Sequence, residues 1–338
     1  MAGLLLVACS EPPSGPPRFA LSQCRVHDVI DGAAGRPLVG IEDLDRTPKG
    51  ELVLSAYDRP AVEQALARGV PPPEGGLHRV ELAALLAGTT RSEPLLPAGS
   101  VTGGLRPHGI AVRGSRLAVV NRRVDGQGRL DPVVMEVDLP ATGPPAVRAI
   151  HKAGGFCALN DVAFDGDLVL ATIDRASCDG PGLADLFPGA ATGRLVELSR
   201  EAIRTVAQGF RYANGVVVLP DGRVAVAETL GRRLRLSDGQ VIELPGAPDN
   251  LSLAPDGRIV VAVQPSLLRF ALWRRGWTQR AGSRVLAVDP VSGAIETLFD
   301  DPTGRTFAGA TAALWTNEGL VAGSVLAGGL LVCRAPAR

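Results

Sequence analysis

Side chains that bind hard cations recur at five places in this chain, each about six to eight residues before the glycine of a tight turn. In chain order they are Glu42 with Asp43, His108, Asn160 with Asp161, Asn214, and Asp249 with Asn250. Each is an ordinary turn or cap residue on its own, so the argument depends on their recurrence. Calcium takes six to eight oxygen ligands, whereas zinc prefers His or Cys, and a single His is in register here. The pattern predicts an oxygen-rich calcium site if the fold brings the five places together.

The elements that carry these residues are predicted β-hairpins. After Asn160 and Asp161, two apolar runs flank the turn at Asp165-Gly166. Six such turns are present, at Lys49-Gly50, Arg113-Gly114, Asp165-Gly166, Asp221-Gly222, Asp256-Gly257 and Glu318-Gly319. A third strand follows each hairpin, and repeats of about fifty residues with four strands are typical of a β-propeller. The sequence therefore predicts an all-β, six-bladed β-propeller. Its innermost strands begin at one end of a central channel, where the five polar places would meet.

The sixth repeat ends after its third strand, near Cys333. We expect residues 19–29 to supply the missing fourth strand, so that the N- and C-terminal strands close the ring and a Cys24–Cys333 disulfide can form. Cys157 and Cys178 flank the third hairpin and form either a second bridge or a pair of thiols. A right-handed α/β fold is the structural alternative. Helical patterns are confined to residues 59–67 and 266–280, which we interpret as insertions between strands.

Composition limits the partners. The 338 residues are 46% apolar, enough for a sizeable core in one domain. The 35 basic and 35 acidic residues cancel, which argues against nucleic acid or an anionic membrane surface and favours a small molecule.

The first residues resemble a targeting segment. Residues 1–8 are similar to a bacterial lipoprotein signal, with Cys9 as the lipidated residue. Residues 9–18 are predicted to form a tether, and residues 19–338 the propeller. This pattern indicates a secreted or cell-envelope protein that faces the periplasm. A chance apolar leader, or a true start further upstream, is the alternative.

The motifs together resemble those of the serum paraoxonase/arylesterase family. They are Glu42-Asp43, Pro107-His108-Gly109-Ile110, Leu159-Asn160-Asp161, Ala213-Asn214-Gly215, Asp249-Asn250 and the pair Cys24 and Cys333. Members of that family are calcium-dependent six-bladed propellers that hydrolyse lactones and aryl esters. The resemblance extends from about Cys24 to Cys333 and preserves order and approximate spacing. Gluconolactonase-like and strictosidine-synthase-like propellers are related alternatives, in which both paired motifs would not be expected.

The resemblance implies two calcium ions. The ligands of a catalytic ion at the channel mouth would be Glu42, Asn160, Asn214, Asp249 and Asn250. Asp43, Asp161 and the backbone carbonyl of Ile110 would hold a structural ion deeper in the channel. Neighbouring strand residues point to opposite sides, so each adjacent pair can serve ions at different depths.

The implied chemistry is hydrolysis of an ester or lactone. The catalytic ion, held by Glu42, would polarise the substrate carbonyl, and His108 would act as the general base for water. The alternative is that His108 donates one hydrogen bond and packs the channel wall.

Two positions depart from the family pattern. Asn121-Arg122 stands where a second His is common, and Gln264-Pro265 stands where His-Pro is common. Arg122 either points into the site, where it would lower the pKa of His108 or bind an anionic substrate group, or lies in solvent. These departures favour lactones over aryl esters and organophosphates. Tyr212 and Thr311 are further candidate substrate-binding residues near the channel mouth.

Residues 267–280 carry Phe270, Trp273 and Trp277 among several arginines. This segment is predicted to form a lid, to rest on a membrane interface, or to pack as a surface helix. The sequence thus predicts a calcium-dependent carboxylic ester hydrolase. The alternatives are a non-catalytic, calcium-stabilised binding propeller and a strictosidine-synthase-like enzyme, and the intact metal set argues against the latter.

Overall fold

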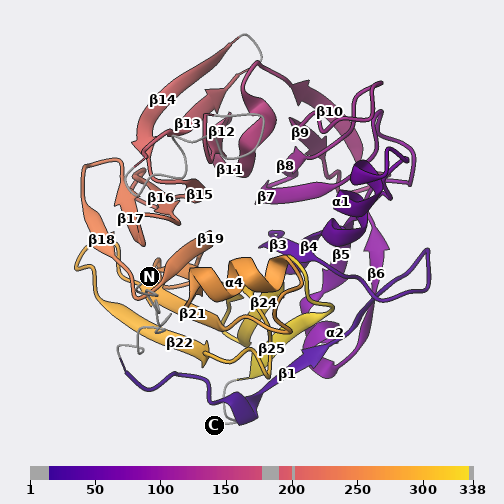
Figure 1. Ribbon diagram of the computed structural model, residues 1–338. Helices are drawn as coiled ribbons and strands as arrows, with labels where there is room; N and C mark the ends of the chain where they lie inside the picture. Colours follow the sequence, from indigo (N-terminus) through magenta and orange to yellow (C-terminus); the bar gives the residue numbers. More distant parts are fainter. Residues whose placement is uncertain (1–14, 177–189, 200–201, 335–338) are drawn as a thin grey trace, which may run out of the picture.

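Six β-sheets stand in a ring around a central channel and form a six-bladed β-propeller, which confirms the predicted fold class (Figure 1). The computed structural model describes residues 15–176, 190–199 and 202–334. Blade 1 contains β3 (Ile41–Arg46), β4 (Glu51–Ala56), β5 (Gly76–Glu81), β6 (Thr90–Pro94) and β2 (Val29–Asp31). Blade 2 contains β7 (Pro107–Arg113), β8 (Arg116–Asn121), β9 (Val133–Asp138) and β10 (Ala146–His151). Blade 3 contains β11 (Leu159–Asp165), β12 (Leu168–Ile173), β13 (Gly193–Leu198) and β14 (Ile203–Phe210).

The other three blades complete the ring. Blade 4 contains β15 (Ala213–Val218), β16 (Val224–Glu228), β17 (Arg233–Leu236) and β18 (Val241–Glu243). Blade 5 contains β19 (Ala247–Leu253), β20 (Ile259–Gln264), β21 (Ser283–Val288) and β22 (Ile295–Asp301). Blade 6 contains β23 (Ala310–Trp315), β24 (Gly319–Ser324), β25 (Leu330–Arg334) and β1 (Cys24–His27). The innermost strands are β3, β7, β11, β15, β19 and β23, as the hairpin pattern predicts.

The two ends of the described chain close the ring together. β1 pairs antiparallel with β25, and Cys24 lies opposite Cys333, to which it is joined by a disulfide. Both the terminal strand and this disulfide are confirmed. The chain then continues into β2, which pairs in parallel with β6 and gives blade 1 a fifth strand that the sequence did not predict. The N-terminal segment therefore fastens blade 6 to blade 1.

Apolar side chains fill the interfaces between successive blades. Six clusters of buried residues each join the facing surfaces of two neighbouring sheets, including the pair formed by blades 6 and 1. Strands covered on both faces need continuous apolar runs, and Leu52, Val53 and Leu54 of β4 are fully buried. The core is thus a ring of interfaces that holds the channel walls in place.

Three helices lie among the described residues. α1 (Arg59–Ala67) matches its prediction and begins at Asp58, whose carboxylate accepts the Ala61 amide hydrogen at 3.0 Å. α4 (Leu267–Arg274) is shorter than the predicted segment, because Gly276 with a φ of 73° follows its end. α2 (Leu82–Ala87) was not predicted. Single turns of 3-10 helix occur at Leu21–Gln23 and Phe156–Ala158. None of the helices in the described ranges has the length and apolar character needed to cross a membrane.

Some predictions fall outside these ranges. Residues 1–14, which hold the predicted signal and the predicted lipidation site Cys9, are not among the described residues, and neither is Cys178. Lipidation of Cys9 and the pairing of Cys178 with Cys157 therefore stay predictions.

Ring closure by the disulfide yields a stability prediction. The bond links residues separated by 309 positions, so its loss frees a very long loop in the unfolded chain. Replacing both cysteines, Cys24→Ser with Cys333→Ser, is expected to lower the free energy of unfolding by about 4 kcal/mol. Urea titration would measure the change. Reductant should destabilise the native protein more than the double variant, and equal unfolding midpoints for the two proteins would contradict the prediction.

Candidate functional site

The predicted site residues lie where the pairing of each inner strand is irregular. The register shifts between Ile41 and Asp43, Pro107 and Ile110, Leu159 and Val162, Ala213 and Val216, Pro248 and Leu251, and Ala310 and Ala312. Such bulges release a residue from the ladder and re-aim its side chain. Glu42, His108, Asn160, Asn214 and Asp249 lie at these irregularities. All six inner strands thus contain a bulge at the same place, and the bulge turns a side chain toward the channel mouth.

Two glycines let the bulged strands approach each other. A Cβ at Gly109 would lie 2.5 Å from the Cα of Asp161, and one at Gly215 would lie 2.6 Å from the carbonyl oxygen of Asp249. Only glycine fits there, because the obstacle is the backbone of the next blade. This explains why glycine follows His108 and Asn214 in the sequence.

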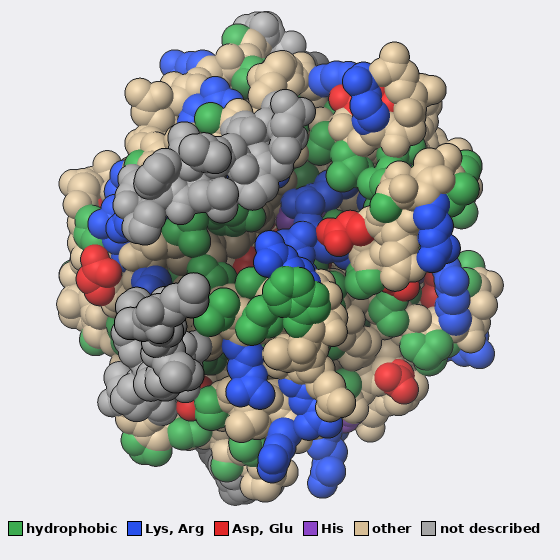
Figure 2. All heavy atoms as spheres, in the orientation of Figure 1, with side chains coloured by type: hydrophobic (Ala, Val, Ile, Leu, Met, Phe, Trp, Pro, Cys, Tyr) green, Lys and Arg blue, Asp and Glu red, His purple; other side chains and the backbone are tan. Residues whose placement is uncertain are grey.

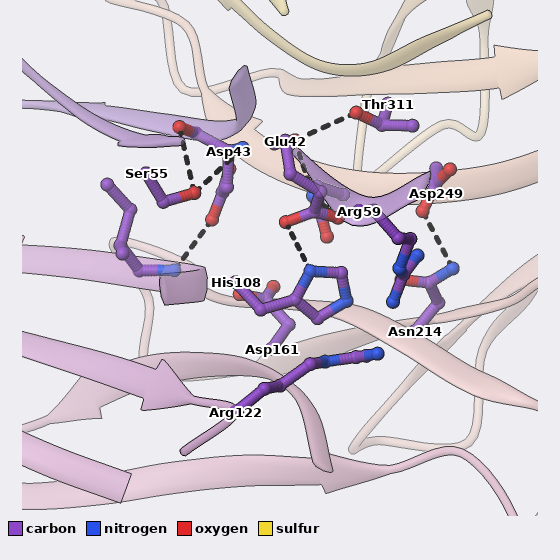
Figure 3. A network of polar contacts seen from close by, with 12 residues as sticks. Glu42, Asp43, Ser55, Arg59, His108, Arg122, Asp161, Asn214, Asp249 and Thr311 are labelled. Carbon is purple, nitrogen blue, oxygen red and sulfur yellow. Dashed lines mark hydrogen bonds and ion pairs between the residues drawn. The ribbon is translucent and has the colours of Figure 1, made fainter. Parts of the chain in front are cut away.

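A cavity of about 580 Å³ opens at this end of the channel and brings the predicted residues together. Glu42, His108, Asn160, Asn214 and Asp249 line it. The predicted substrate residues Arg122, Tyr212 and Thr311 also line it, so Arg122 points inward (Figure 3). Thr311 uses its hydroxyl to hold the site, since Oγ1 donates to the Glu42 carbonyl at 2.8 Å.

Hydrogen bonds fix the orientation of two amides in the site. Asn214 Nδ2 donates to Asp249 Oδ1 at 2.8 Å and to Thr229 Oγ1 at 3.0 Å. Asn250 Nδ2 donates to Glu42 Oε1 at 3.1 Å, which places Asn250 in the set although it does not line the cavity. Carboxylates accept only, so each amide must turn its NH₂ toward them. The Oδ1 atoms of Asn214 and Asn250 therefore point away from these carboxylates.

Three buried amide oxygens of this set lack a hydrogen-bond partner. They are Asn160 Oδ1, Asn214 Oδ1 and Asn250 Oδ1. Glu42 Oε2 is also buried and lies 3.0 Å from His108 Nδ1. An unpaired buried acceptor costs about 1–3 kcal/mol, so a set of three is expected only if something else satisfies it. A hard cation is suited to such a donor set. Within the described ranges no group of three or more His, Cys, Asp or Glu side chains is arranged to hold a metal ion, so a metal here would depend on the amides.

The deeper carboxylates hold neighbouring blades together. Asp43 accepts the backbone amide hydrogens of Leu44 and Ile110, at 2.8 and 2.7 Å. Asp161 does the same with Val162 and Val216, at 2.7 and 2.8 Å. Ile110 thus meets Asp43 through its N–H, whereas the sequence interpretation assigned its carbonyl to a metal. Both oxygens of each carboxylate already have a partner.

Burial and charge shift the titration of the site. Burial raises the pKa of Glu42 to about 7, and burial with the charge of Glu42 raises that of Asp249 to about 7. Burial, followed by the charges of Arg122 and Arg59, holds the pKa of His108 well below its usual range. His108 Nδ1 lies 3.0 Å from Glu42 Oε2 (Figure 3). The imidazole is therefore uncharged at neutral pH, with Nδ1 toward a carboxylate.

Sequence reasoning missed Arg59 and assigned no role to Gln264, whereas a lid was one of its predictions for residues 267–280. Arg59, at the start of α1, is buried beside the site, because the insertion that carries it folds over the channel mouth. Gln264 Nε2 donates to the Ala310 carbonyl at 2.7 Å, and its Oε1 is buried without a partner. The segment 267–280 also contributes, since Leu267, Phe270 and Arg274 of α4 line the cavity, whereas Trp277 is 70% exposed.

Tyr212 adds strained backbone to the wall. Its φ is 67°, which is unusual for a bulky side chain. Its side chain is hydrogen-bonded to the buried carboxylate of Asp174, and burial raises its pKa.

Comparison with known proteins shows similarity in fold but not in sequence. No family model and no curated protein matches this chain in sequence. An aldose sugar dehydrogenase from Streptomyces coelicolor, solved in its PQQ-bound form, is similar with a TM-score of 0.55, 13% identity, and coverage of 92% of this chain and 97% of that one. A luciferin-regenerating enzyme has a TM-score of 0.52 and 13% identity, covering 89% of this chain and 93% of the other. A protein provisionally described as a gluconolactonase has a TM-score of 0.52 and 12% identity, covering 97% and 95%. These similarities show the propeller fold alone.

The close approach at Gly215 gives a prediction about site geometry. Gly215→Ala places a methyl group against the backbone of β19 and is expected to cost about 1–3 kcal/mol of unfolding free energy. Gly154→Ala is the matched control, because no atom lies within 4 Å of its added Cβ. Thermal unfolding of both variants would test this, and equal melting temperatures would contradict it.

Proposed function

We propose that this protein is a calcium-dependent hydrolase of lactones or aryl esters, as in the paraoxonase/arylesterase family. The observation that carries the proposal is the set of three buried, unpartnered amide oxygens at the channel mouth, those of Asn160, Asn214 and Asn250. With the carboxylates of Glu42 and Asp249 they supply oxygen donors from five side chains, and calcium completes six to eight ligands with water or substrate. The two carboxylates would balance the charge of one divalent ion. The similarity to a gluconolactonase-like structure agrees with this class through the fold only.

The first ion would be held by Glu42, Asn160, Asn214, Asp249 and Asn250. When bound, it would supply a positive charge that stabilises the oxyanion developing on an ester carbonyl. A second ion, between Asp43 and Asp161, is a weaker fit, because backbone amides already occupy all four of their oxygens. The number of calcium ions released on chelation distinguishes one site from two.

His108 would act as the general base. A neutral imidazole that faces Glu42 carries its proton on Nδ1, which leaves Nε2 as the acceptor. Nε2 would take a proton from water as the water oxygen bonds to the acyl carbon. The acyl C–O bond then breaks, and the proton passes to the leaving alkoxide. Glu42 thus fixes the tautomer of the base as well as holding the ion.

Removal of calcium gives the first functional prediction. Chelation is expected to lower the melting temperature and abolish hydrolysis of a panel of lactones and phenyl acetate. Saturation at 100 times the Kd would restore about 2.7 kcal/mol of stability. Glu42→Gln and Asp249→Asn should weaken calcium binding, measured by calorimetry, whereas Asp167→Asn changes a solvent-exposed carboxylate and serves as the control.

Two outcomes of that experiment would overturn the proposal. If calcium does not bind, the unpartnered oxygens have another role. If calcium binds and stabilises the protein but no ester or lactone is hydrolysed, the binding propeller is the better interpretation.

The role of His108 gives a separate prediction. His108→Gln removes the proton acceptor and is expected to lower kcat about 10²- to 10⁴-fold. Calcium affinity should stay within a few-fold of the native value, because the ligand oxygens are retained. A kcat within threefold of the native enzyme would show that His108 only packs the channel wall.

A further inference from the structure

The cavity is lined by more arginines than acidic residues. Five arginines and four acidic residues line it, and Lys and Arg side chains lie at the central hollow on this face (Figure 2). Glu42 and Asp249 are the two acids assigned to calcium in the proposed function. Glu63 and Asp174 are then the remaining acids.

Two of the arginines are paired with those acids. Arg175 lies 2.8 Å from Asp174, and Arg274 lies 3.2 Å from Glu63. Arg59 reaches the same Glu63 only at 3.8 Å. Glu63 and Asp174 are therefore already paired with other arginines of the cavity.

Arg122 has no carboxylate partner in the described ranges. Its side chain makes one hydrogen bond among the described residues, a 3.5 Å contact from a terminal nitrogen to the Leu159 carbonyl, and its Nε is buried without a partner. Arg59 is only 8% exposed and also faces the site (Figure 3). Their mutual repulsion is visible in the pKa of Arg122, which burial and then the charge of Arg59 lower. Buried charge without a partner is costly unless a ligand satisfies it.

We propose that Arg122 and Arg59 bind an anionic group of the substrate, so that the protein acts on lactones or esters bearing a carboxylate or phosphate. This inference rests on the proposed function. A guanidinium presents a fork of N–H donors that matches the oxygens of either anion. Both side chains lie beside His108 (Figure 3), so the anionic group would hold the ester next to the base and the ion.

The test compares matched substrates. Values of kcat/KM would be measured for a five-membered lactone and for the same ring carrying a carboxylate, with a phosphorylated lactone as a third arm. The native enzyme is expected to prefer an anionic substrate about 10- to 100-fold, the range of a charge-assisted hydrogen bond. The arm with the larger preference identifies the anion.

Variants separate recognition of charge from a general effect. Arg122→Gln should reduce the anionic-to-neutral ratio at least tenfold, mainly through KM, and Arg122→Lys should retain part of it. Arg148→Gln, on the exposed strand β10, should leave the ratio unchanged. An equal loss on neutral and anionic substrates, expressed in kcat, would overturn the inference and assign Arg122 to the reaction itself.

Failure of the inference can be told apart from failure of the proposed function. Equal hydrolysis of neutral and anionic lactones would overturn the inference alone. If the native protein hydrolyses neither, calorimetry with succinate and with inorganic phosphate tests the anion site directly. Binding that Arg122→Gln weakens tenfold or more supports the site, whereas no binding, or equal binding by both proteins, overturns it.

Discussion

Carboxylates buried in the channel are the constraint around which this propeller is arranged. Glu42, Asp43, Asp161 and Asp249 are all buried, and no Lys or Arg within the described ranges forms an ion pair with them. Buried negative charge must be compensated by hydrogen bonds, protons or cations. The deeper pair is compensated by backbone amides of neighbouring blades, so charge and ring assembly are linked there. At the mouth, amide side chains occupy part of each carboxylate and leave further oxygens without a partner. The two levels of the channel therefore differ in how their carboxylates are compensated, although they share adjacent residues.

The local device behind both levels is the bulge in each inner strand. A regular strand would send alternate side chains into the two blade interfaces, which are apolar. The register shifts at Glu42, Asn214 and Asp249 break this alternation once in each blade and direct polar groups into the channel. Gly215 then permits the close approach that this geometry demands. Because the same irregularity recurs in six blades, one local solution yields a site made of residues far apart in the chain.

Much of this arrangement was predictable because it repeats. The turn glycines and apolar runs predicted the six blades. Asn160, Asn214 and Asp249 hold the same position in their repeats, which predicted that they meet at one end of the channel. What does not repeat was missed. β2 and α2 are short elements with weak patterns, and Arg59 lies in an insertion whose path over the mouth depends on tertiary packing. The sequence also could not reveal that Asp43 and Asp161 each accept a backbone amide hydrogen from the next blade, since those bonds cross 67 and 55 residues.

The arginines change how the metal and the substrate depend on each other. Before an ion binds, the charges of Arg59 and Arg122 stabilise ionised Glu42. A divalent ion at Glu42 and Asp249 would take over that role and would be repelled by both guanidinium groups. An anion held between those groups relieves the repulsion, so calcium and an anionic substrate each favour binding of the other. By linkage the coupling is reciprocal, and a neutral substrate lacks it. The same buried positive charge would thus make calcium binding tighter in the complex with an anionic substrate than in the protein alone.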